Sequence, residues 1–256
     1  MRDFTRKLYK ELLSSMLNSG FEFYVLKELC AEEMKEPYIV LRHDVDRNPQ
    51  NALRMAEIEN GMGIKATYYF RVVKKVFDPE IIKKISSMGH EIGYHYEDLS
   101  AQHGDVEEAL KSFKRNIEML RELVPVNTVS MHGIPLSKYD NRKLMPHLNF
   151  AELEILCEPY SIVENMGLVY LTDTGRSWNN NLINVRDKVS STSDFKVKST
   201  LRLIDAIGKE LSGKNMMLNI HPERWEDTVL PWLWNLTWQR FKNIIKYTLI
   251  KVNYGR

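Results

Sequence analysis

Strand-like segments alternate along the chain with helix-like segments of about ten residues or more, and this alternation constrains the fold most strongly. Apolar runs rich in β-branched and aromatic residues predict strands at 37–46, 65–72, 91–96, 127–133, 167–174 and 216–222. Apolar residues recurring every three or four positions predict helices at 3–19, 49–61, 78–89, 106–123 and 199–211. Strands separated by helices of this length pair in parallel through right-handed crossovers, so we expect an α/β fold. Periodicity alone fits both an open sheet and a barrel.

Length and composition narrow the class of protein. The 256 residues suit one parallel barrel, so we expect a single domain over 1–256, with an N-terminal helix at about 3–20 and a Trp-rich helical segment at about 225–252. Hydrophobic residues at 43% and charged residues at 27% exclude a fibrous repeat or long disorder. A net charge of +2 gives no footprint for nucleic acid. No apolar run reaches the roughly 18 residues that span a bilayer, so we expect no transmembrane segment.

The cysteines and the first residues bear on the compartment. Cys30 and Cys157 allow one bridge at most and form no disulfide framework. The start, MRDFTRKLYKELL, lacks the uninterrupted apolar core of a secretory signal. We therefore expect a reduced, cytoplasmic protein, and the sequence leaves its oligomeric state open.

Acids and imidazoles follow the apolar part of five predicted strands. They are Asp44 and Asp46, then His95 and Glu97, then His132, Asp173 and His221. In parallel α/β folds the carboxyl ends of the strands, with the loops after them, form the functional site. We therefore expect these side chains to converge.

The spacing within this set indicates particular chemistry. Asp44 and Asp46 lie on one side of an extended strand, which suits a metal ligand beside a general base. Asp46 also fits a turn or a helix cap. His95 with Glu97 combines imidazole and carboxylate, which suits zinc. His221 suits a general acid because an imidazole side chain titrates near neutrality, and the alternative is a structural imidazole hydrogen-bonded to a nearby carbonyl.

Three motifs together resemble the NodB-like polysaccharide deacetylases of carbohydrate esterase family four. They are RHDVD at 42–46, GHEIGYH at 89–95 and LNIHP at 218–222, so the resemblance spans roughly 37–222. It implies an irregular, incomplete (β/α) barrel of the TIM-like kind. It also implies a hydrolase that removes acetyl groups from N-acetylated sugars or sugar-linked substrates, with a divalent metal, most often zinc.

The resemblance implies a role for each matching position. Asp44 would be the catalytic base, and Asp46 and His95 would be metal ligands. His221 would be the general acid, and Asp173 lies near the acidic motif that orients that histidine.

The sequence departs from the family pattern where a second metal histidine is expected, because that position is Leu99. His132, in the MHGIP segment that replaces an arginine-bearing element, is our first candidate for the missing ligand. Glu97 is the second candidate, and otherwise we expect it to contact substrate. RHDVD, GYHYEDL, MHGIP and NIHPERW together resemble a divergent branch associated with surface-polysaccharide biosynthesis.

Two other functions stay open at this point. The chain would hydrolyse another non-peptide C–N bond, as allantoinase-like relatives do, with or without a metal. Alternatively, it would bind glycans without catalysis, having lost the metal site at Leu99.

The C-terminal segment concentrates four tryptophans, Trp225, Trp232, Trp234 and Trp238. Sugar stacking or an interfacial membrane contact would explain them. We favour a helix over 236–250 that closes the side of the barrel, with the tryptophans in its packing seam. Trp225 is the exception, because it lies close enough to His221 to contact a substrate.

Overall fold

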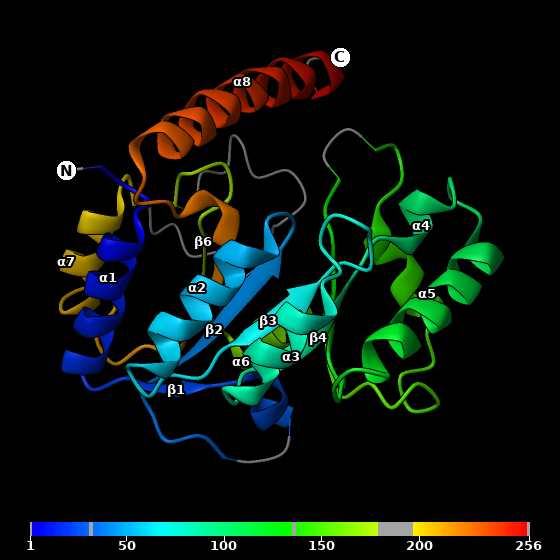
Figure 1. Ribbon diagram of the computed structural model, residues 1–256, viewed down its shortest axis with the longest axis horizontal. Helices are drawn as coiled ribbons and strands as arrows, with labels where there is room; N and C mark the ends of the chain where they lie inside the picture. The colour runs from blue at the N-terminus through cyan, green and yellow to red at the C-terminus, as the bar shows by residue number, and fades with distance from the viewer. Residues whose placement is uncertain (1, 31–32, 135–136, 179–196, 255–256) are drawn as a thin grey trace.

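A seven-stranded parallel sheet forms the centre of the computed structural model, which describes residues 2–30, 33–134, 137–178 and 197–254 (Figure 1). The strands are β1 (Glu22–Tyr24), β2 (Tyr38–Val45), β3 (Thr67–Phe70), β4 (Glu91–Tyr96), β5 (Val129–Met131), β6 (Val169–Thr172) and β7 (Met216–Ile220). They lie in the order β5-β4-β3-β2-β7-β6, and β1 pairs with the beginning of β2. Each of these pairings is parallel, as the alternation of segments predicted.

The sheet does not close into a barrel. Within the described ranges no ladder joins β5 to β6, which lie at opposite ends of the strand order. An isolated bridge between Thr128 and Cys157 instead lies at the outer edge of β5. The expected α/β fold, an incomplete (β/α) barrel, is therefore confirmed.

Helices and 3₁₀ turns connect the strands and surround the sheet (Figure 1). They are α1 (Arg6–Asn18), η1 (Leu26–Cys30), α2 (Pro49–Asn60), α3 (Pro79–Ser87), α4 (Asp98–Ala101), α5 (Val106–Arg121), η2 (Asn141–His147), α6 (Pro159–Met166), α7 (Thr200–Ile207), η3 (Pro222–Arg224) and α8 (Val229–Tyr254). Side-chain caps explain where several begin: Thr5, Asp78 and Asp105 accept hydrogen bonds from amides in the first turns of α1, α3 and α5.

The buried core supports the ends of the central strands. All eight residues of β2 are buried, and so are those of β3 and β4. Gly93 in β4 is required because a side-chain carbon there would collide with the ring of Tyr69. The Tyr69 ring lies 5.5 Å from the guanidinium carbon of Arg42. Core packing below the carboxyl ends of the strands therefore fixes the positions of the polar side chains there.

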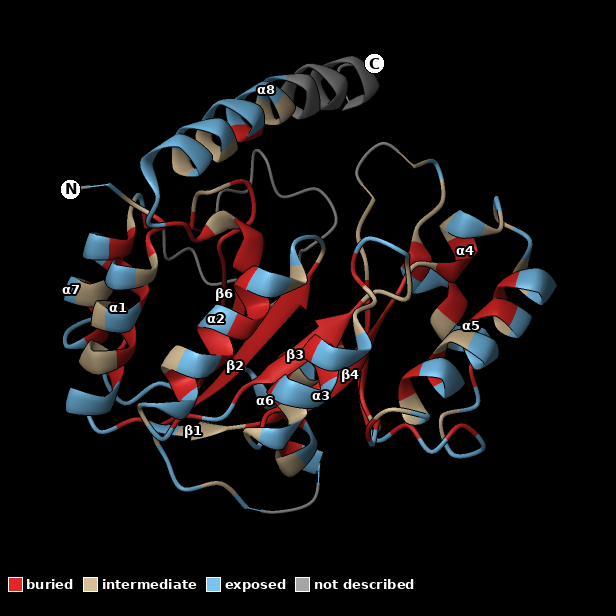
Figure 2. Cartoon of the chain, in the orientation of Figure 1, coloured by how far each residue is buried: buried red, intermediate tan, exposed pale blue. Residues whose placement is uncertain are grey.

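The C-terminal helix α8 does not pack as the sequence suggested. Figure 2 shows its first half, as far as Ile244, largely exposed along the outside of the molecule, and Trp234 and Trp238 are 70% and 44% exposed. Trp232 contacts the protein, where its Nε1 donates to the Asp3 carbonyl at 2.7 Å. Trp234 and Trp238 do not lie in a packing seam along the barrel, which corrects that expectation for these two residues. Among the described residues, no helix combines the length and the apolar character that a membrane crossing requires.

Cys30 and Cys157 are joined as a disulfide, with their Cα atoms 6.9 Å apart. The bond ties η1 to the segment that pairs beside β5. The composition led us to expect free thiols, and the structure pairs them instead. The compartment itself is not tested by this pairing.

Candidate active site

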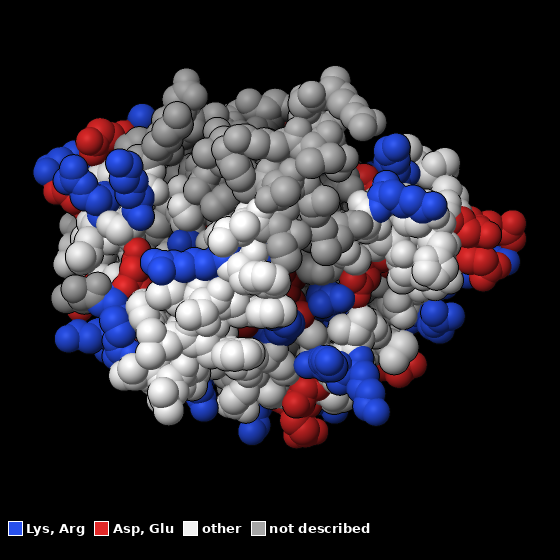
Figure 3. All heavy atoms as spheres, turned by 90° about the horizontal axis from the view of Figure 1, so that it is seen from above, with Lys and Arg blue, Asp and Glu red and all other residues white. Residues whose placement is uncertain are grey.

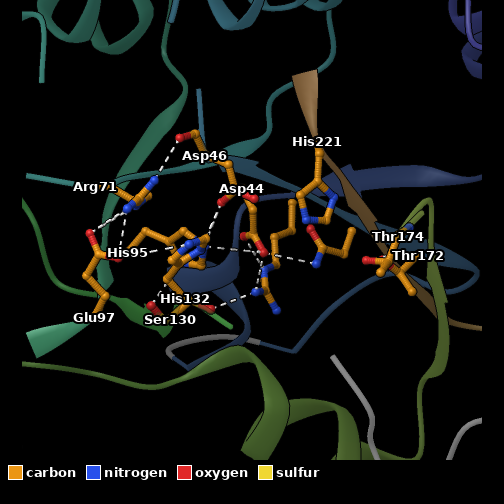
Figure 4. Close-up of polar contacts among 12 residues, drawn as sticks. Asp44, Asp46, Arg71, His95, Glu97, Ser130, His132, Thr172, Thr174 and His221 are labelled. Carbon is orange, nitrogen blue, oxygen red and sulfur yellow. Dashed lines mark hydrogen bonds and ion pairs between the residues drawn. The ribbon is translucent and has the colours of Figure 1, made fainter. Parts of the chain in front are cut away.

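The side chains expected to converge do so at the carboxyl ends of the strands. Figure 4 shows Asp44, Asp46, His95, His132 and His221 directed toward one another. They come from the ends of β2, β4, β5 and β7 and from the residues just after them. Parallel pairing brings these ends to one edge of the sheet, which explains why residues distant in sequence meet here.

Asp44 is held by an arginine on its own strand. Arg42 Nε donates to Asp44 Oδ1 at 2.9 Å and Nη2 donates to Oδ2 at 2.8 Å. Asn219 of β7 donates to the same Oδ2 at 3.0 Å. Burial alone would raise the pKa of Asp44, but Arg42, with His95 and His221 nearby, lowers that pKa to about 2. The carboxylate is therefore ionised at any physiological pH.

Arg42 is itself almost completely buried. It donates to Ser130 Oγ at 2.7 Å, and its guanidinium carbon lies 4.8 Å from the centre of the Tyr160 ring. A buried guanidinium needs such partners, because an unpaired buried charge is costly. Arg42 was not among the expected site residues, although its spacing of two from Asp44 places both on one side of the strand.

Asp46, His95 and His132 form a cluster of three potential metal ligands. Asp46 Oδ1 lies 3.4 Å from His95 Nε2 and 3.0 Å from His132 Nδ1. The two imidazole nitrogens are 3.3 Å apart. His95 Nδ1 lies 3.0 Å from the Ser130 carbonyl, and a proton donated there leaves Nε2 with its lone pair toward the cluster. One carboxylate and two imidazoles are the donors that zinc and similar cations take.

One oxygen of the cluster, Asp46 Oδ1, shows that the cluster fits a cation. Asp46 Oδ1 is buried and accepts no hydrogen bond of good geometry, although two nitrogens lie close to it. Burial raises the pKa of Asp46, but His132 and His95 outweigh that effect and lower the pKa well below its ordinary value. Three converging donors around an under-satisfied carboxylate oxygen fit a divalent cation.

The structure separates the two candidates for the third ligand. His132 lies in the cluster, where its amide donates to the Tyr96 carbonyl at 2.7 Å. Leu99 is buried in the core and contributes no donor. Glu97 lies just outside the cluster, with Oε2 4.0 Å from His132 Nε2.

Glu97 is engaged by Arg71, a residue that the sequence analysis did not single out. Arg71 Nη2 donates to both oxygens of Glu97, at 2.7 and 2.8 Å, and Nη1 donates to the Asp46 carbonyl at 3.0 Å. The Arg71 contacts hold the Glu97 carboxylate and support the positions of His132 and Asp46. The expected substrate contact of Glu97 stays a prediction.

His221 lies across from the cluster and is oriented by Asp173. Its Nδ1 lies 2.7 Å from Asp173 Oδ1, and its backbone amide donates to the same carboxylate. Burial and Arg224 lower the pKa of His221, but Asp173 and Asp46 outweigh them and raise that pKa above 6.5. Asp173 therefore has the orienting position that the resemblance implied.

Trp225 is placed differently from our expectation. It is 0% exposed, and its Nε1 donates to Asp173 Oδ2 at 2.8 Å. Arg224 Nη1 donates to Asp173 Oδ1 at 2.6 Å. A fully buried ring cannot stack on a sugar, so this placement corrects the proposed substrate contact. Trp225 holds Asp173, which holds His221.

Comparisons with known proteins give structural likeness only. No protein-family model matches the chain, and a search of curated proteins finds no significant match. A Streptococcus mutans CE4 esterase is 12% identical, with 86% of this chain and 85% of that chain covered and a TM-score of 0.45. A family 4 carbohydrate esterase from Streptomyces lividans in complex with acetate is 13% identical over 84% and 91%, with a TM-score of 0.43. The Bacillus subtilis peptidoglycan deacetylase PdaC, as a mutant, is 14% identical over 82% and 96%, with a TM-score of 0.36.

At 12 to 14% identity and TM-scores of 0.36 to 0.45, these likenesses carry no conclusion about the activity of this chain. The chemistry of the site therefore depends on the geometry of this chain.

Proposed function

We propose that this chain is a metal-dependent hydrolase that removes an acetyl group from an N-acetylated sugar or sugar-linked intermediate. The observation that carries the proposal is the position of Asp44. Its Oδ2 lies 3.7 Å from His95 Nε2, so a base lies beside the Asp46–His95–His132 cluster. His221 faces the same space (Figure 4).

The cluster is suited to hold the metal. Asp46, His95 and His132 supply one oxygen and two nitrogens, and we propose zinc. When bound, such a cation acts as a Lewis acid on the acyl oxygen and lowers the pKa of a water.

The side chains of this protein supply the proton transfers. Asp44, ionised and fixed by Arg42 and Asn219, accepts the proton of the attacking water. His221, whose pKa Asp173 and Asp46 raise above its ordinary value, donates a proton to the departing amine nitrogen. Asp173 contacts Nδ1 of His221 and keeps the ring in one orientation. Nε2 is therefore the ring nitrogen that is left to transfer the proton. The amide C–N bond breaks, and the products are acetate and a free amine.

The substrate class rests on the motifs RHDVD, GHEIGYH and LNIHP, which resemble those of sugar deacetylases. The divergent branch that they resemble suggests a role in surface-polysaccharide biosynthesis, for which we propose a cytoplasmic location. That location predicts that Cys30 and Cys157 are reduced in the cell, because cytosolic thiols are kept reduced. Rapid alkylation of intact cells followed by mass spectrometry tests it, and a fully oxidised pair would overturn the cytoplasmic location.

The direct test is acetate release by purified protein loaded with zinc and supplied with N-acetylglucosamine oligosaccharides. We expect one metal per chain by elemental analysis and measurable acetate. Asp44→Asn should abolish acetate release and keep the metal. Asp205→Asn is the matched control. Asp205 lies on α7, is exposed, and pairs with Lys209 in the turn that follows the helix.

Other outcomes distinguish the remaining functions. A protein that is active without bound metal would favour hydrolysis of a different C–N bond and overturn the metal-dependent mechanism. A protein that binds these oligosaccharides and releases no acetate would be a glycan-binding relative.

A further inference from the structure

The outward side of α8 is apolar, which is the reverse of an ordinary surface helix. Leu230, Leu233, Trp234, Trp238, Phe241 and Ile244 are exposed by 77%, 44%, 70%, 44%, 55% and 65%. These positions recur at three or four residues and so lie on one side of the helix. The rings of Trp234 and Trp238 are stacked with centres 6.4 Å apart, and Phe241 stacks on Trp238 at 5.8 Å. We call these six residues the α8 apolar face.

The opposite side of α8 is polar and attaches the helix to the protein. Asn235 Nδ2 donates to the Glu223 carbonyl at 3.1 Å, and Asn243 Nδ2 donates to the Gly175 carbonyl at 2.9 Å. Gln239 is buried between them and donates to Asn243. These hydrogen bonds fix which side faces outward. The α8 apolar face is therefore exposed because hydrogen bonds attach the other side of the helix to the protein, and not because the helix is loosely attached.

The charge of α8 has a single sign. The helix carries Arg240, Lys242, Lys246 and Lys251, and the chain has no Asp or Glu after Asp227. Aromatic and aliphatic residues on one side of a helix, with only basic charges beside them, are typical of helices that lie in the headgroup region of a membrane. Figure 3 views the molecule from the side that carries α8, and part of the described surface there is neither acidic nor basic.

We propose that the α8 apolar face docks the protein on the surface of an anionic lipid bilayer. Anionic headgroups would meet the basic residues, and the aromatic side chains would enter the boundary with the acyl chains. A second copy of this chain fits less well, because two α8 helices would bring only like charges together. Nucleic acid would leave the apolar face without a partner. The bonds from α8 to Gly175 and Glu223 follow β6 and β7, so the helix crosses the end of the sheet that holds the candidate site.

Vesicle binding by the full chain tests the proposal independently of any hydrolysis. The probes are phosphatidylcholine vesicles with and without phosphatidylserine, and acyl-brominated lipids that quench nearby tryptophans. We expect sedimentation with the anionic vesicles, weakening as salt rises, and quenching of fluorescence. Trp234→Ser, Trp238→Ser and Phe241→Ser combined should abolish both signals. Arg240→Gln and Lys242→Gln combined should weaken binding roughly tenfold or more.

A matched control removes exposed apolar side chains elsewhere. Leu156, Met166 and Leu201 are exposed by 55%, 44% and 46%, and serine at all three positions should leave vesicle binding unchanged. Circular dichroism and light scattering verify that each variant is folded and report its oligomeric state. Equal binding by the wild type and the α8 serine variant would overturn the proposal. So would a dimer that this variant dissociates, without any vesicle binding by the wild type.

Discussion

Arg42 and Asp44 lie two residues apart on one side of β2 and form a buried, two-pronged ion pair, with Nε–Oδ1 and Nη2–Oδ2 distances of 2.9 and 2.8 Å. The pair keeps the carboxylate ionised and fixed in direction beside the Asp46–His95–His132 cluster. A base that needs no rearrangement to act is pre-organised for proton transfer. Four expectations follow from this and the neighbouring contacts.

Replacing Arg42 by Met should both destabilise the protein and abolish activity. Removing one partner of a buried ion pair leaves the other charge uncompensated, which costs about 3–5 kcal/mol of the free energy of unfolding. Urea denaturation measures this change. Arg202→Met is the control, because Arg202 is exposed and its loss should change stability by no more than about 0.5 kcal/mol. Equal stability of the two variants would contradict a structural role for the Arg42–Asp44 pair.

Glu97→Gln should weaken zinc binding by about 10- to 100-fold without removing a ligand. Glu97 holds Arg71, which in turn donates to the Asp46 carbonyl. Competition with a chromophoric chelator measures the affinity. Glu152→Gln, at an exposed pair with Lys114, should leave it unchanged. An unaltered zinc affinity in Glu97→Gln would show that this carboxylate does not support the cluster.

The pH dependence of kcat/KM should show a fall on the alkaline side. Asp173 and Asp46 raise the folded-state pKa of His221 above its ordinary value, so its protonated form persists to higher pH and is lost as pH rises through that raised pKa. Asp44, with a pKa of about 2, sets no limb near neutrality. Asp173→Asn removes the charge that raises the pKa of His221, and should move the alkaline limb to lower pH. An alkaline limb that does not move would exclude His221 as the acid held by Asp173.

Trp225→Phe should lower kcat by about 10-fold and leave KM unchanged, because one hydrogen bond to a carboxylate is lost and no substrate contact is removed. The phenyl ring keeps most of the buried apolar contact with Phe4 and Tyr9. Steady-state kinetics separate the two parameters. A raised KM at constant kcat would restore the substrate contact that the buried position argues against.

Residues at strand ends could be predicted from the sequence because their positions depend on local patterns. The alternation of apolar strand-like and helix-like segments located β2, β4, β5, β6 and β7. The side chains at the carboxyl ends of these strands then indicated the chemistry of the site. His132 was a candidate ligand for the same reason. The sheet order brings its strand beside β4, with His95 opposite Ser130.

Other features depend on contacts that no local pattern contains. Asn219 meets Asp44 because β7 pairs with β2 in a register that sets Arg42 opposite Asn219. Arg71, directly after β3, donates to Glu97, directly after β4. The direction of α8 was missed for a related reason: apolar periodicity identifies one side of a helix, but only the hydrogen bonds of Asn235 and Asn243 show that the other side faces the protein.

Anomalous scattering at the zinc edge, from crystals grown with zinc, tests the central claim most directly. We expect a single strong peak within bonding distance of Asp46 Oδ1, His95 Nε2 and His132 Nδ1, next to the Asp44 carboxylate. Zinc bound elsewhere on the chain, with none between these three side chains, would contradict the account.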